Sequence, residues 1–111
     1  MSVQRLHVTS RYCEVAIAGN LVHLAGQLAY DTSTDITIQT QQTLANIDRL
    51  LLEAGTDKSH ILSVFIFLKD IEKDYAAMNA VWNAWLAEGH PPARTGVESK
   101  LYAAEVSAER T

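Results

Sequence analysis

The chain has 111 residues, of which 48% are hydrophobic and 20% charged, a composition that excludes a disordered chain and predicts one domain over residues 1–111. The formal net charge of -4 argues against a nucleic-acid partner, because such proteins usually carry a basic surface. No apolar run is long enough for a signal peptide or a membrane span, and Cys13 is the one cysteine, so no internal disulfide can form. We therefore expect a cytoplasmic protein with no membrane partner.

The first part of the chain predicts short strands joined by a tight turn. A strand is expected over Val3–Val8, and a clearer pair over Glu14–Ala18 and Leu21–Leu28. Gly19 and Asn20 separate this pair, and both tolerate the positive φ that a two-residue hairpin turn requires. The pattern therefore predicts a β-hairpin.

A long helix is predicted next, from Ile36 to Ala54. Asp35 can cap its start by accepting a hydrogen bond from a free amide, and Gly55 stands where a C-terminal cap belongs. Apolar and small residues recur at helical spacing and form the expected inward row: Ile36, Thr40, Leu44, Ile47, Leu51 and Ala54.

The segment Ile61–Leu68 predicts a strand, and its part from Val64 to Leu68 is continuously apolar, which is typical of a strand covered on both faces. A second helix is expected from Asp70 to Gly89, with one stripe formed by Tyr75, Met78, Trp82 and Trp85. This stripe is interpreted as core or subunit contact.

Gly89 and two prolines then end the helix, so Ala93–Ser99 is expected to be extended, with Arg94, Gly96 and Glu98 on one face. After a turn over Leu101–Ala104, a last strand is expected over Glu105–Thr111.

The order β-β-β-α-β-α-β-β predicts an α+β domain with two helices on one face of a mixed sheet. Two helices can cover only one face of the sheet, whereas the apolar strand Val64–Leu68 needs to be covered on both of its faces. Self-association is the simplest way to supply the second cover.

Few side chains have the spacing of a catalytic or metal site. The four histidines lack metal-ligand spacing, so we predict surface or strand-end positions and no metal site. Cys13 has no CxxC partner and is interpreted as a small packed side chain. Arg94 offers a planar fork that matches a carboxylate, either of a ligand or, in a salt bridge, of Glu98 or Glu109.

Several stretches resemble the Rid family, the reactive intermediate deaminases also called YjgF-like proteins. They occur in that family's order and spacing: Ala18–Val22, Ala25–Gln27, Thr43–Ile47, Val64–Asp70, Ala77–Asn79 and the run His90–Arg94. The resemblance implies a chorismate-mutase-like fold, a homotrimer and ligand clefts between neighbouring subunits.

The resemblance also implies roles for particular residues. Arg94 matches the arginine that grips the substrate carboxylate, and Glu109 the glutamate that positions the attacking water. Tyr12, Gly26 and Asn79 match residues that line the cleft, although packing or capping explains Tyr12 and Asn79 almost as well.

Three positions depart from the family pattern, and they indicate a shorter, divergent branch. Ala25 stands where many deaminases have serine, Gly96 where many have cysteine, and Arg11 where proline is usual. The arginine is kept, but a hydroxyl near the imine is lost.

The resemblance therefore implies a hydrolase, a deaminase that converts 2-iminobutanoate, 2-iminopropanoate or similar 2-imino acids to 2-keto acids and ammonia, without a cofactor. One alternative is a non-catalytic carrier or sensor of small carboxylates. Another is an endoribonuclease, which the acidic net charge disfavours.

Overall fold

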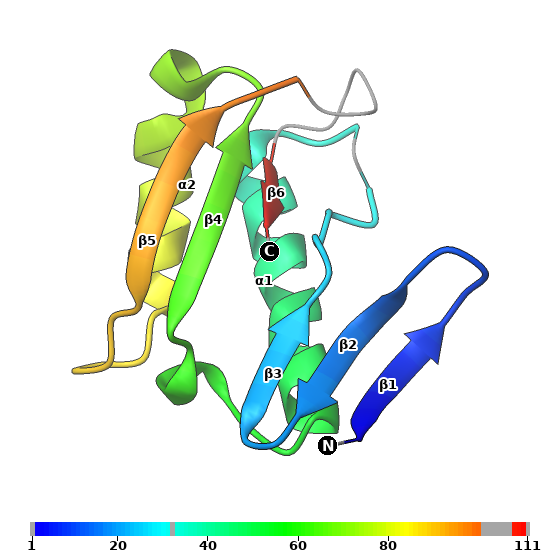
Figure 1. Ribbon diagram of the computed structural model, residues 1–111. Coiled ribbons are helices and arrows are strands. Elements are labelled where there is room, and N and C mark those ends of the chain that lie inside the picture. The colour runs from blue at the N-terminus through cyan, green and yellow to red at the C-terminus, as the bar shows by residue number, and fades with distance from the viewer. Residues whose placement is uncertain (1, 32, 101–107, 111) are drawn as a thin grey trace.

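The computed structural model describes residues 2–31, 33–100 and 108–110. Within this part of the chain, the strands form two three-stranded sheets, ordered β1-β2-β3 and β5-β4-β6. Both α-helices lie behind the strands in Figure 1. No helix of the described residues is long and apolar enough to cross a membrane.

The first sheet is an antiparallel meander of β1 (Val3–Val8), β2 (Cys13–Ala18) and β3 (Leu21–Leu24). The predicted hairpin is confirmed, because Ala18 pairs with Leu21 and Gly19 has a φ of 60°. β3 is shorter than the predicted strand, which was expected to continue to Leu28. Its last bond to β2 runs from the Ala25 amide to the Glu14 carbonyl, and the chain then leaves the sheet.

The first helix, α1 (Ile36–Glu53), begins where the sequence predicted and ends one residue earlier. The Asp35 carboxylate accepts a hydrogen bond of 2.9 Å from the Ile38 amide, so the predicted cap is confirmed. Gly55 follows the helix with a φ of +85°. The predicted inward row is buried up to Leu51, and Ala54 is half-buried.

β4 (Ser63–Leu68) begins two residues later than predicted, because Ile61 caps a preceding 3-10 helix, η1 (Lys58–His60), with its amide bonded to the Lys58 carbonyl. The second helix, α2 (Ile71–Trp85), is capped by Asp70, whose carboxylate accepts from the Lys73 amide. It ends four residues before the predicted stop at Gly89. Leu86 turns into an extended conformation there, with a ψ of 137°.

β5 (Ala93–Glu98) pairs with β4 in parallel, so α2 is the crossover between two neighbouring strands. β6 (Ala108–Arg110) pairs antiparallel with the other edge of β4. The predicted turn at 101–104 and the first part of the predicted last strand, 105–107, lie outside the described residues.

The core lies between the helices and β4. Val64, Ile66 and Leu68 are buried against residues of both helices, including Leu44 and Met78. The other face of β4 and β5 carries Phe65, Phe67, Thr95 and Val97, and we call it the open face. In the single chain the part of the open face around Phe65 of β4 is uncovered, as the 48% exposure of Phe65 shows. The predicted α+β fold with both helices on one side is confirmed.

Candidate functional site

Arg94 lies near the start of β5 and faces α2. In the parallel register it lies beside Val64, while Gly96 lies beside Ile66 and Glu98 beside Leu68. Val64, Ile66 and Leu68 form the buried, helix-facing side of β4. Residues paired across two adjacent strands point to the same face of the sheet, so the predicted placement of Arg94, Gly96 and Glu98 on one face is confirmed.

Two side chains of α2 hold the Arg94 guanidinium. Nη1 donates a hydrogen bond of 2.8 Å to Oδ1 of Asn79, and Nη2 donates one of 3.0 Å to the Tyr75 hydroxyl. The guanidinium carbon lies 5.3 Å from the centre of the Trp82 ring and 5.8 Å from that of Tyr75, which are cation–π distances. These four contacts fix both the position and the plane of the guanidinium.

Tyr75 is a site residue that the sequence interpretation assigned to the core stripe. It is 41% exposed, whereas Met78 and Trp82 of the same stripe are buried. The Asn79 amide hydrogen bond and the Arg94 guanidinium lower the pKa of Tyr75. The signal in the sequence was the spacing of four between Tyr75 and Asn79, which places both on one helix face.

Glu98 does not form the salt bridge with Arg94 that was one alternative. Its carboxylate instead accepts a hydrogen bond of 3.0 Å from the Ile71 amide, at the first turn of α2. Arg94 forms no ion pair with a carboxylate of residues 2–31 or 33–100. A guanidinium has five N–H donors, so donors remain for a ligand after the bonds to Asn79 and Tyr75.

The other predicted site residues lie elsewhere in the single chain. Tyr12 is exposed in the β1–β2 connection, which lies at the opposite end of the strands from the start of β5 (Figure 1). Gly26 follows β3. The backbone of Glu109 pairs with Phe67, and β4 lies between β6 and β5. One chain thus brings Arg94 to Asn79 but does not bring the other three residues to this pair.

A cavity of about 670 Å³ lies between β3 and β4. Its lining includes Val22 and Leu24 of β3, Val64 and Phe65 of β4, and Trp82, whose ring also contacts Arg94. This cavity is mostly apolar and lies next to the open face.

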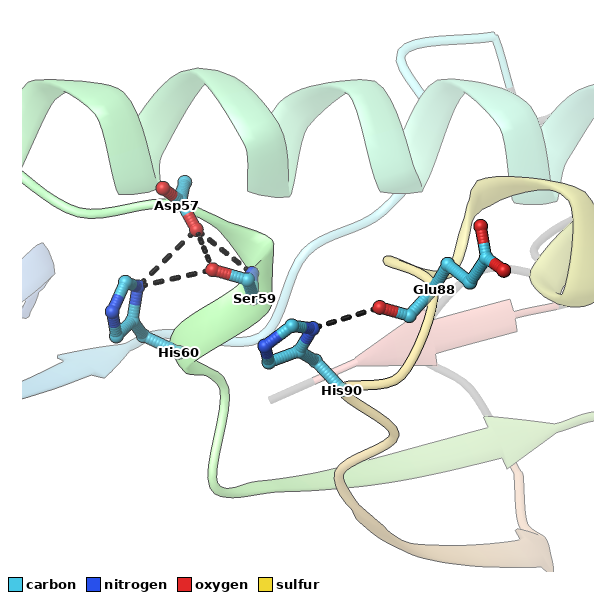
Figure 2. A network of polar contacts seen from close by, with 5 residues as sticks. All are labelled: Asp57, Ser59, His60, Glu88 and His90. Carbon is cyan, nitrogen blue, oxygen red and sulfur yellow. Dashed lines mark hydrogen bonds and ion pairs between the residues drawn. The ribbon is translucent and has the colours of Figure 1, made fainter.

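Polar residues around η1 form a local network (Figure 2). The Asp57 carboxylate accepts hydrogen bonds from the Ser59 amide and hydroxyl, which lower the pKa of Asp57, and it lies 3.2 Å from His60 Nδ1. His90 Nδ1 donates to the Glu88 carbonyl. Both histidines are exposed and bonded within their own turns. The described residues hold no group of three potential metal ligands.

The fold and the arginine site together define a small α+β domain of the YjgF type, as the sequence resemblance indicated. The family model described as Endoribonuclease L-PSP matches residues 2–109, so the chain belongs to this family. A RutC family protein of Haemophilus ducreyi is 40% identical over 99 residues, which are 89% of this chain and 84% of that protein.

Two solved structures have the same fold over nearly the whole chain. A YjgF family protein of Neisseria meningitidis is 42% identical with a TM-score of 0.95, over 99% of this chain and 91% of that one. A protein of Pseudomonas aeruginosa is 41% identical with a TM-score of 0.95, over 98% of this chain and 94% of that one.

Proposed function

We propose that the protein is an imine deaminase that hydrolyses small 2-imino acids to 2-keto acids and ammonia. The observation that supports this most directly is the Arg94 guanidinium, fixed by Asn79 and Tyr75 and unpaired with any carboxylate of residues 2–31 and 33–100. A planar cation in this state is suited to a ligand carboxylate, which it can bind through two parallel hydrogen bonds.

The carboxylate contact would orient the adjacent C=N carbon for attack by water. Water adds to that carbon, the imine nitrogen takes up a proton, and the resulting carbinolamine expels ammonia to leave the 2-keto acid. Each step needs only water and proton transfers, so correct positioning and one acid or base suffice. Glu109 is the proposed residue that orders or deprotonates the water.

We further propose that the complete site forms between subunits of a homotrimer. Glu109, Tyr12 and Gly26 do not meet Arg94 within one chain, so a neighbouring copy is the proposed source of these groups. The open face supports association, because Phe65 is 48% exposed there and a second copy would cover it.

The decisive experiment generates 2-iminobutanoate or 2-iminopropanoate in situ with an amino-acid oxidase or dehydratase and follows the free imine. We expect the purified protein to accelerate its loss, and an Arg49→Lys variant, altered in an exposed arginine of α1, to retain full activity. If the imine decays as in buffer while 2-ketobutyrate still binds, the protein is a carrier or sensor.

An endoribonuclease is the second candidate, and the description of the matching family model favours it. The net charge of -4 opposes it, because phosphate contacts supply most of the affinity for RNA. RNA cleavage that depends on Arg94, without imine hydrolysis, would establish this candidate over the deaminase.

A further inference from the structure

We infer that the Tyr75 hydroxyl is a second ligand-binding group of the Arg94 site. It would make the site select carboxylates that carry an oxo or imino group on the neighbouring carbon over plain carboxylates of the same length. This inference rests on the proposed function and specifies its substrate class.

Tyr75 is placed both to contact Arg94 and to reach a ligand. Its hydroxyl lies 3.0 Å from Arg94 Nη2, and the side chain is 41% exposed. A Cβ atom built on Gly96 would lie 3.8 Å from Cε1 of the tyrosine ring, so the ring lies against this part of β5. The hydroxyl is therefore fixed on three sides, by Arg94, by Asn79 and by its own packed ring.

The hydrogen bonds of Tyr75 leave its proton available. A phenol oxygen accepts two hydrogen bonds and donates one. The Arg94 guanidinium donates to this oxygen, and the Asn79 side chain also contacts it. Among residues 2–31 and 33–100 no acceptor receives the hydroxyl proton, and the exposed side of the group is where a ligand would bind. The same two contacts lower the pKa of Tyr75, which makes the hydroxyl a stronger donor.

Two neighbouring donors of different kinds suit two neighbouring acceptors on one small molecule. The remaining N–H groups of Arg94 match a carboxylate, and the hydroxyl beside Nη2 can donate to an acceptor on the next carbon. A 2-keto acid offers an oxo oxygen there and a 2-imino acid a nitrogen, whereas a saturated fatty acid offers neither. Binding both groups would also fix rotation about the bond that joins the carboxylate to the reacting carbon.

The test compares 2-ketobutyrate with butyrate, which differ only in the oxo group, by calorimetric titration. We expect the wild type to prefer 2-ketobutyrate, and Tyr75→Phe to lower the affinity for 2-ketobutyrate about three- to tenfold more than the affinity for butyrate. Tyr30→Phe is the matched control, because Tyr30 is 82% exposed and outside the site. Thermal melting checks that both variants remain folded.

Three outcomes would overturn the inference while leaving the carboxylate site intact. These are equal wild-type affinities for the two acids, a preference that persists in Tyr75→Phe, and an equal loss of both ligands in that variant. The last would show that Tyr75 only supports Arg94. Failure of the wild type to bind either acid would instead contradict the carboxylate site itself, and the inference with it.

Discussion

Arg94 on β5 and Asn79 on α2 are joined by a hydrogen bond of 2.8 Å between the guanidinium and the amide oxygen. The acceptor is uncharged, so the contact positions the arginine without neutralising it. A carboxylate in the place of the amide would satisfy the same geometry but would cancel the charge that a ligand needs. The choice of amide is therefore what separates a binding arginine from a structural one.

Asn79→Asp tests this directly. The new carboxylate would stand about where the amide oxygen now accepts from Arg94, and it would compete with any ligand carboxylate. We expect the affinity for 2-ketobutyrate to fall at least about tenfold with no loss of thermal stability. Asn83→Asp adds the same charge at an exposed position one turn further along α2 and should have little effect. Equal losses in the two variants would point to net charge as the cause.

Arg94→Lys should keep the fold but lose most ligand affinity and activity. Lysine retains the charge, but it cannot present two parallel donors to one carboxylate. Removing one partner of a desolvated, hydrogen-bonded charge pair costs about 2–5 kcal/mol, and the lower end corresponds to roughly thirtyfold in affinity. Titration and turnover measure this loss, with Arg49→Lys as the control. Wild-type turnover together with a lowered melting temperature would place Arg94 in the scaffold.

Phe65→Ser should weaken self-association. The residue is 48% exposed in one chain, so the substitution costs little within the monomer. Burying a phenylalanine contributes about 1.5–3 kcal/mol, so the concentration at which copies dissociate should rise by tenfold or more. Sedimentation should show a trimer for the wild type at micromolar concentration and smaller species for the variant.

Leu52→Ser is the matched control, because Leu52 is a 71% exposed apolar residue on α1, away from the open face. The Leu52→Ser variant should form the same oligomer as the wild type. A folded wild-type monomer would contradict the predicted self-association, and a dimer would contradict the proposed number of three subunits.

Glu53→Gln should alter the pH dependence of stability. The hydrogen bond from His7 is the main cause that lowers the Glu53 pKa below its ordinary value of 4.5. A lowered folded pKa stabilises the folded state above the unfolded pKa, and this contribution disappears as the pH falls through the folded pKa. The wild type should therefore melt at a higher temperature than Glu53→Gln above pH 4.5, and the gap should close in acid. Glu88→Gln, at an exposed loop position, is the matched control for the loss of one carboxylate.

The order and type of the elements were predictable because local signals agreed with the global fold. Asp35, Asp70 and Gly19 each have the conformation or cap that their residue type favours. Boundaries that depend on tertiary pairing were predicted less well. β3 ends at Leu24, where the chain leaves β2 after one more bond from the Ala25 amide, although β2 continues to Cys13, and nothing in the apolar run to Leu28 signals this end.

The candidate site was predictable only in part, for a similar reason. The alternation of β5 placed Arg94 on one face, and the match to family motifs pointed to Asn79. Tyr75 was missed because an aromatic residue at helical spacing is usually core, and whether it lies at the rim depends on which strand runs beside the helix. The proposed meeting of Arg94 with Glu109 depends on a second copy, which periodicity along one chain does not encode.

The two charged side chains of β5 have a further consequence for aggregation. β5 is the outermost strand of its sheet within the described residues, and such an edge can pair with a strand of any other chain. Arg94 and Glu98 stand near its two ends and point inward to α2. Inward-pointing charges discourage edge-to-edge pairing, because an added strand that pulled β5 away from α2 would leave both charges without partners. Arg94, proposed to bind substrate, therefore also helps, together with Glu98, to protect the sheet from uncontrolled growth.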